Sequence, residues 1–247
     1  MRFRRLLTLR ALVTALAIWL GLSTTVVLIV AVIGGGPNTR AVILMGSGLV
    51  LLWIALGGTL MHLARDRVRA FVLRLPWDWR VSFVLMATLL ALLEEAVTTG
   101  MTNLAPLFVV PIGAAYITAS ANYLDVVGLH SVVVFVPMFV AWAVLLRRLA
   151  FSPSAVFVLF GLTGTLAEAS FGGAQAFAQI AMWVFVYGLM VYLPAYCLPT
   201  ERGAAPPRGW HYLLAVVLPF VFAIPVAGVV GALHPVRIHF PPIPPNS

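Results

Sequence analysis

Four ionisable side chains lie inside long apolar stretches of this sequence: Glu94, Glu95, His130 and Glu168. A charged side chain near the middle of a membrane-spanning helix costs about 2.5–3.5 kcal/mol, so such residues are rare and mostly functional. Three ionised glutamates would cost roughly 8–10 kcal/mol on the same scale. No arginine lies in these apolar stretches to neutralise them, and the chain contains no lysine.

Three interpretations of these residues are open. A divalent metal ion such as zinc, iron or manganese would supply the positive charge, with Glu95, His130 and Glu168 as its ligands. The two Glu-x-x-His pairs of a di-iron carboxylate site are missing. Alternatively, the carboxyl groups hold protons and serve general acid chemistry or proton coupling. The third interpretation is a buried hydrogen-bond network without a catalytic role.

The composition predicts a membrane protein. Of the 247 residues, 62% are hydrophobic and 9% are charged, and the mean hydropathy is +1.07. Soluble domains are about half apolar and about a quarter charged, which excludes an ordinary soluble enzyme, a disordered chain and a nucleic-acid-binding protein. The net charge of +8 comes from arginines in short clusters between apolar runs. The single cysteine, Cys197, cannot form an internal disulfide.

Seven segments are long and apolar enough to cross a membrane, since a spanning helix needs about 20 such residues. They predict an all-α, polytopic transmembrane bundle that forms one integral membrane domain over residues 1–247. The first segment is longer than the apolar part of a signal peptide, so we interpret it as a retained span. The seven segments are 12–33, 41–63, 81–103, 124–146, 154–173, 176–198 and 210–233.

The arginines give an independent prediction of the topology. With the N-terminus inside the cell, every arginine except Arg40 and Arg237 falls in an inner segment, and residues 64–80 form the largest inner loop. Basic residues are enriched on the inner side of membrane proteins. We therefore predict that the N-terminus lies inside and the C-terminus outside, in the plasma membrane of a prokaryote.

Two further segments do not fit as spans. Residues 104–123 are apolar, but Pro106, Pro111 and Gly113 interrupt them. We predict a re-entrant or interfacial segment, which is either a lid over the outer ends of the third and fourth spans or a plain interfacial loop. Residues 234–247 are rich in proline and predict an extended tail that is exposed on the outer side.

The helical rise places the four ionisable residues at a similar depth. At about 1.5 Å per residue, the three glutamates lie about 20 Å from the inner ends of their spans, and His130 lies about 9 Å below an outer end. In a hydrocarbon core of about 30 Å, all four therefore meet in the outer half. Polar residues expected to line a cavity there are Thr99, Asn103 and Gln175.

The other acidic and histidine residues near the outer side have simpler interpretations. Asp125 follows Asn122 at the start of the fourth span, where we expect it to cap the helix. Four histidines near inner ends or in the outer tail are interpreted as interfacial or solvated: His62, His211, His234 and His239.

The pair Glu94-Glu95 followed by His130 resembles the CAAX-protease and bacteriocin-processing family, in which a glutamate pair and histidines organise an intramembrane hydrolytic site. Thr99 stands where that family has an arginine, and Val126 where it has an aromatic residue. The glutamate pair and the residues after it are also similar to the acidic motif of membrane lycopene cyclases, without that motif's proline and paired phenylalanines. Both resemblances imply an enzyme site within the membrane.

We therefore expect an intramembrane enzyme that acts on a lipid-soluble or membrane-embedded substrate. Glu95 and Glu168 would be metal ligands or acid and base, His130 a ligand or base, and Glu94 a supporting group. The alternatives are a proton- or cation-coupled transporter that uses the same carboxyl groups, and a non-catalytic subunit of a membrane complex. The expected partners are the lipid bilayer and a lipophilic substrate or transported solute, with the oligomeric state left open.

Overall fold

The structure is a computed structural model that describes residues 2–243, with side chains from Leu9 onward. Helices make up 78% of it, and the described part of the chain contains no β-strand. The predicted all-helical bundle is therefore confirmed. The predictions that used the side chains of Arg2, Arg4 and Arg5, and the tail residues 244–247, lie outside the described part.

The helices follow the seven predicted segments in order. Six stretches are long and apolar enough to cross a membrane, and a bent pair of helices forms a seventh. The helices are α1 (Arg2–Gly34), α2 (Pro37–Leu49), α3 (Gly58–Val72), α4 (Trp79–Asn103), α5 (Tyr123–Leu129), α6 (Val132–Arg148), α7 (Pro153–Gly172), α8 (Ile180–Tyr196) and α9 (Gly209–Leu233).

The second span is longer than the sequence predicted. A π-helical stretch, Val50–Gly57, joins α2 to α3, so that one helix runs from Pro37 to Val72. At about 1.5 Å per residue its 36 residues cover about 54 Å, well beyond a hydrocarbon core of about 30 Å. The helix therefore extends through most of the predicted inner loop, 64–80, and the actual connection to α4 is short.

The fourth predicted span, 124–146, is broken. Helices α5 and α6 meet at His130 and Ser131 with a bend of 44°. The preceding segment, 104–123, does not span: it begins with a 3₁₀ turn, Ala105–Phe108, and continues as irregular loop. This loop packs on the start of α2 and the end of α4, through an apolar cluster of Ala41, Met45, Met101, Ala105, Val110 and Ala115.

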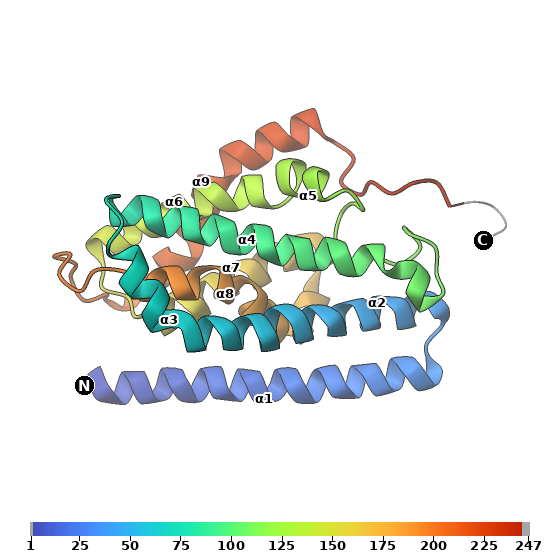
Figure 1. Cartoon of the computed structure of the whole chain (residues 1–247), viewed down its shortest axis with the longest axis horizontal. Coiled ribbons are helices and arrows are strands. Elements are labelled where there is room, and N and C mark those ends of the chain that lie inside the picture. The colour runs from blue at the N-terminus through green and yellow to red at the C-terminus, as the bar shows by residue number, and fades with distance from the viewer. Residues whose placement is uncertain (1, 244–247) are drawn as a thin grey trace.

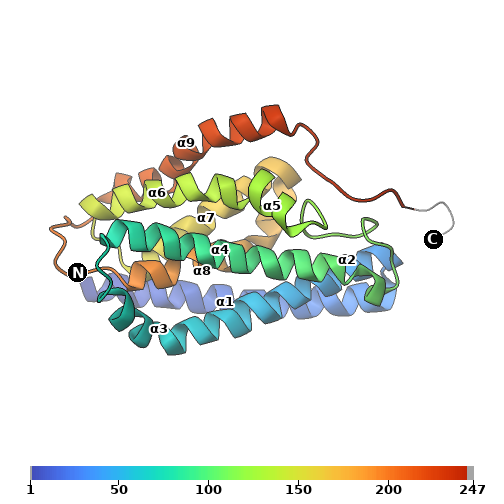
Figure 2. The same ribbon diagram turned by 45° about the horizontal axis from the view of Figure 1, so that its top comes forward.

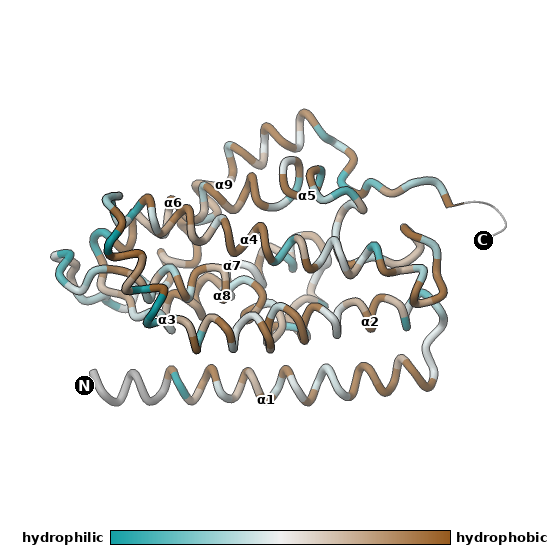
Figure 3. Tube along the Cα trace, in the orientation of Figure 1, coloured by the Kyte–Doolittle hydropathy of each residue, from teal (hydrophilic) through white to brown (hydrophobic). Residues whose placement is uncertain are grey.

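The spanning helices lie roughly side by side along the long axis of the molecule, with α1 at the outside of the bundle (Figure 1, Figure 2). The connections from α3 to α4, from α6 to α7 and from α8 to α9 lie at one end, where hydrophilic residues gather (Figure 3). We call this the arginine-rich end. The loop 104–122 and the tail lie at the opposite end. Which end faces the cytoplasm remains a prediction.

Helix α4 packs against α2, α6 and α8 with one face, which carries Glu94 and Glu95. The interior around these helices is filled by large side chains, among them Trp142, Phe139 and Met190. The π-helical stretch is tied to α8 because Trp53 Nε1 donates a 3.0 Å hydrogen bond to the Val186 carbonyl oxygen. The glutamate-bearing part of α4 is thus held in a packed interior.

The closest helix contact joins α7 and α8, and small residues make it possible. An added Cβ at Gly161 would lie 2.6 Å from the Val184 backbone, and one at Gly188 would lie 2.7 Å from the Phe157 carbonyl oxygen. Without side chains at these positions the two backbones approach closely. This contact sets the position of Glu168 on α7 relative to Tyr187 on α8.

The replacement Gly161→Ala should therefore destabilise the protein. Over-packing a tight contact costs about 1–3 kcal/mol, which exceeds the gain of about 1 kcal/mol from replacing a helical glycine by alanine. We expect a lower thermal midpoint in detergent. Gly100→Ala is the matched control, because nothing lies within 4 Å of its added Cβ and its midpoint should stay equal or rise. An unchanged midpoint for Gly161→Ala would contradict the contact.

The start of α4 is fixed by Asp78. Its Oδ1 accepts a 2.8 Å hydrogen bond from the Arg80 backbone N–H, and its Oδ2 accepts one of 2.6 Å from Arg80 Nη2. These bonds favour the ionised carboxylate and lower the pKa of Asp78 from 3.8 to about 2. The helix that carries Glu94 and Glu95 therefore begins with a cap that depends on charge.

The variant Asp78→Asn tests this cap, because asparagine keeps the backbone bond but loses the ion pair. Because the pKa of Asp78 is lower in the folded state, its stabilising effect is present above pH 3.8 and disappears as the pH falls through about 2. Thermal midpoints should be higher for the wild type above pH 3.8 and should converge towards pH 2. A constant difference at all pH values would contradict the assignment.

Candidate functional site

The structure brings the three glutamates together between α4, α7 and α8. Glu94 and Glu95 are buried, with exposed fractions of 4% and 7%, while Glu168 is half-buried. Glu94 lies close enough to interact electrostatically with both other carboxyl groups. The Tyr187 hydroxyl donates a hydrogen bond to Glu168 Oε1. We call these four residues the carboxyl cluster.

Hydroxyl groups surround the Glu95 side of the carboxyl cluster. The Thr98 hydroxyl lies 3.2 Å from Glu95 Oε2 and 3.1 Å from the Glu95 carbonyl oxygen. Ser131, at the break between α5 and α6, lies beside the Glu95 carboxyl group. The Tyr123 hydroxyl donates a 2.9 Å bond to the Leu92 carbonyl oxygen. The start of α5 is thereby fastened to α4 next to the site.

The carboxyl cluster has no cationic partner among the described side chains. The ion pairs in this part of the chain involve Asp66, Asp78 and Asp125, none of which belongs to the cluster. Carboxylates that share one site repel each other, so they do not all ionise together. The arrangement can therefore donate and accept protons within an apolar interior.

The polar residues expected to line the site lie in three different environments. Thr99 is buried, and its hydroxyl has no hydrogen-bond partner among the described residues. Asn103 is exposed and instead fastens the loop 104–122, because its Nδ2 donates to the carbonyl oxygens of Thr99 and Ala121 at 3.0 and 2.9 Å. Gln175 is exposed in the 3₁₀ segment Ala174–Gln179, beyond the end of α7.

His130 belongs to a different group of side chains. The structure places it with His234 at the end of α9 and His239 in the tail, and one ring nitrogen of each lies within 4.8 Å of the others. In the described part of the chain this is the one group of three potential metal ligands at such spacing. The ligand set Glu95, His130 and Glu168 stays a prediction, while His130 lies at metal-ligand spacing from two other histidines.

One expectation at this end is corrected. Asn122, not Asp125, caps α5, since its side chain accepts a 3.0 Å bond from the Leu124 backbone N–H. Asp125 instead lies 3.3 Å from His234 Nε2. His234 and His239 are half-buried, which agrees with an interfacial position. The described part of the tail is irregular and mostly exposed, as predicted, but it also contacts the protein, because the His239 backbone N–H donates to the Ala119 carbonyl oxygen at 2.8 Å.

Two surface clefts lie at the arginine-rich end, away from the carboxyl cluster. A cavity of about 240 Å³ is lined by the connection between α3 and α4 and by the end of α8, including Trp77 and Cys197. A second cleft of about 410 Å³ lies between α4 and α6, with apolar walls and Arg80, Arg147 and Arg148 at its rim. Burial raises the pKa of the Cys197 thiol to about 11, which keeps this thiol unreactive at neutral pH.

The fold is that of a multi-pass integral membrane protein with a buried carboxyl cluster. Comparison with protein-family models, curated protein sequences and solved structures finds no match.

The hydrogen bond between Tyr187 and Glu168 predicts energetic coupling between the two residues. Coupling across helices in membrane proteins averages about 0.6 kcal/mol and reaches about 1.7 kcal/mol. A double-mutant cycle of Tyr187→Phe and Glu168→Gln, measured by unfolding in detergent, should give a coupling in this range. Tyr212→Phe paired with Glu168→Gln is the control, because no hydrogen bond joins them. Additive effects for the first pair would contradict the contact.

Proposed function

We propose that this chain is an intramembrane enzyme that performs general acid–base catalysis on a lipid-soluble or membrane-embedded substrate. The proposed location is the plasma membrane of a prokaryote, with the arginine-rich end inside, as the positive-inside rule favours. The carboxyl cluster supplies the acid and base groups. The main observation behind this proposal is that three glutamates from two helices converge in an apolar interior around one tyrosine.

Three members of the carboxyl cluster have distinct roles in this proposal, and Glu94 is a supporting group. Glu168 is the residue that meets the substrate, because it is half-buried whereas Glu94 and Glu95 lie behind it. Tyr187 orients the Glu168 carboxyl group through its hydrogen bond. Glu95 exchanges protons with Glu168, since carboxyl groups that share a site differ in protonation.

The surface near Glu168 favours a lipophilic substrate. Phe171, three residues further along the same helix and on the same side, is an exposed apolar side chain. A substrate that approaches this face therefore meets an apolar ring before it reaches the carboxyl group. Apolar walls with a few polar groups are typical of sites for small lipophilic molecules.

A proton-coupled transporter is the second candidate function, and the broken fourth span favours it. Irregular backbone within a membrane domain is typical of the binding sites of secondary transporters. Here the break at His130 and Ser131 lies beside Glu95. In this case the same glutamates would carry protons across the membrane together with a solute.

The test is to replace Glu95 and Glu168 by glutamine in the native host and to compare extracted membrane lipids by mass spectrometry. The double variant should accumulate one lipophilic compound and lose another, because the acid and base are absent. Glu201→Gln is the matched control, since Glu201 is exposed at the arginine-rich end, and its lipid profile should equal that of the wild type.

The outcomes separate the candidate functions. An unchanged lipid profile, combined with a proton flux into proteoliposomes that the double variant loses, would contradict the enzyme function and support the transporter function. An unchanged profile with no flux, and a partner protein that copurifies in stoichiometric amount with both forms, would contradict both functions in favour of a non-catalytic subunit.

A further inference from the structure

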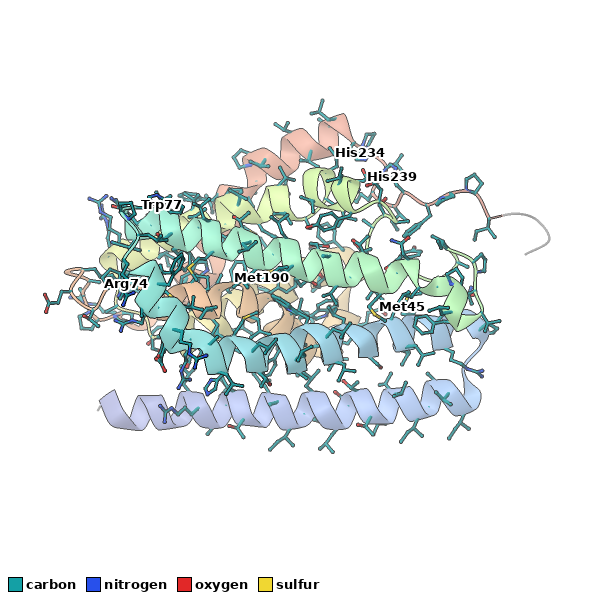
Figure 4. The ribbon with its side chains drawn as sticks, viewed as in Figure 1. Met45, Arg74, Trp77, Met190, His234 and His239 are labelled. Carbon is teal, nitrogen blue, oxygen red and sulfur yellow. The ribbon has the colours of Figure 1, made fainter. Side chains whose placement is uncertain are left out.

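Three potential metal ligands and a neighbouring carboxyl group meet opposite the arginine-rich end of the bundle, and none of them belongs to the carboxyl cluster. Asp125 lies in the first turn of α5, His130 at the break between α5 and α6, His234 at the end of α9, and His239 in the tail. Figure 4 shows His234 and His239 next to each other beside α5. We call these residues the histidine cluster.

The spacing of the histidine cluster matches that of ligands around one metal ion. In a tetrahedral zinc site with bonds of about 2.0–2.1 Å, neighbouring ligand atoms are about 3.3 Å apart. Asp125 Oδ1 lies 3.3 Å from His234 Nε2, and Asp125 Oδ2 lies 3.7 Å from His130 Nε2. The three imidazoles each offer a nitrogen within 4.8 Å of the others. A small closing movement would complete the coordination shell.

The hydrogen bonding of the imidazoles supports a metal ligand role. The ring Nε2 of His239 bonds the Val236 carbonyl oxygen. A bond from one ring nitrogen to a backbone carbonyl is the usual arrangement of a histidine whose other ring nitrogen binds a metal. His130 Nε2 is buried and has no hydrogen-bond partner among the described residues. A bound cation would satisfy this nitrogen.

The tail is held in place by contacts outside the histidine cluster. Phe240 stacks on Tyr116 of the loop 104–122 with ring centroids 4.8 Å apart, and the Arg237 guanidinium lies 4.9 Å from the Phe171 ring centre. The loop approaches closely at Gly113, where φ is +94° and an added Cβ would lie 2.8 Å from Phe240. These contacts orient the tail before any metal binds.

We propose that His130, His234, His239 and Asp125 bind one zinc-type divalent cation. Imidazole nitrogens favour zinc and related transition metals over magnesium or calcium, which prefer oxygen ligands. Four protein ligands leave no open position, as in structural zinc sites. The ion fastens the tail and the end of α9 to the break between α5 and α6. This inference does not depend on the proposed enzymatic function.

The experiment is a zinc titration of the purified full-length protein after removal of bound metal with a chelator. The wild type should bind one zinc ion per chain, and its thermal midpoint should rise with zinc but not with magnesium. His239→Ala and His234→Ala should each weaken zinc binding by at least about 100-fold. Replacing a residue that only supports a metal ligand already lowers the metal affinity 10–100-fold, and these two variants remove a ligand itself. His62→Ala is the matched control, because His62 bonds Arg65 elsewhere in the protein.

Substitution with cobalt(II) provides a second measurement that does not depend on protein stability. A tetrahedral cobalt site should give a visible absorption spectrum in the wild type and in His62→Ala, and none in His239→Ala. Absence of stoichiometric zinc binding by the wild type would overturn the proposal. Zinc binding of equal strength in His239→Ala, or a midpoint that rises equally with magnesium, would overturn it as well.

Discussion

The structure depends on the cost of placing carboxyl groups in an apolar interior. An unpaired polar group there is destabilising by several kcal/mol, so α4, α7 and α8 must meet where their polar side chains can bond each other. Tyr187 meets this requirement for Glu168, and Thr98 does so for Glu95. The small residues between α7 and α8 follow from the same need, because the tyrosine reaches the glutamate only when the two helices approach closely.

The break between α5 and α6 connects two sites that a straight helix would keep apart. Its two central residues belong to different surroundings: His130 is part of the histidine cluster, and Ser131 lies beside Glu95. A bend of 44° at this point turns α5 towards the end of α9 while α6 continues through the bundle. The histidine cluster and the carboxyl cluster are therefore linked by a single peptide unit of the chain.

The sequence predicted the spans and the similar depth of the three glutamates, because both follow from the regular geometry of the α-helix. Hydropathy marks an apolar segment, and the rise per residue converts position into depth for Glu94 and Glu168 alike. The break at His130 does not follow from such rules, since residues 124–146 are apolar enough on average to be taken as one span despite the polar His130 and Ser131. Tyr187 was missed because one tyrosine in an apolar helix looks like an ordinary core residue.

The histidine cluster was missed for a related physical reason. Its members come from positions 125–130 and 234–239, and no local spacing marks residues so far apart in the chain as neighbours. A tail rich in proline and histidine looks solvated in the sequence, because its contact partner is not apparent there. That partner is the loop 104–122, which is equally irregular.

Loop and tail together cover the end of the bundle near the carboxyl cluster, through the contacts of Asn103, His239 and Phe240. With that end covered, the half-buried Glu168 on α7 is the member of the cluster nearest the protein surface, with the exposed ring of Phe171 three residues further along the helix. In the proposed function, the substrate would therefore approach the acid groups from the side of the bundle, which suits a substrate dissolved in the bilayer better than one that arrives from water.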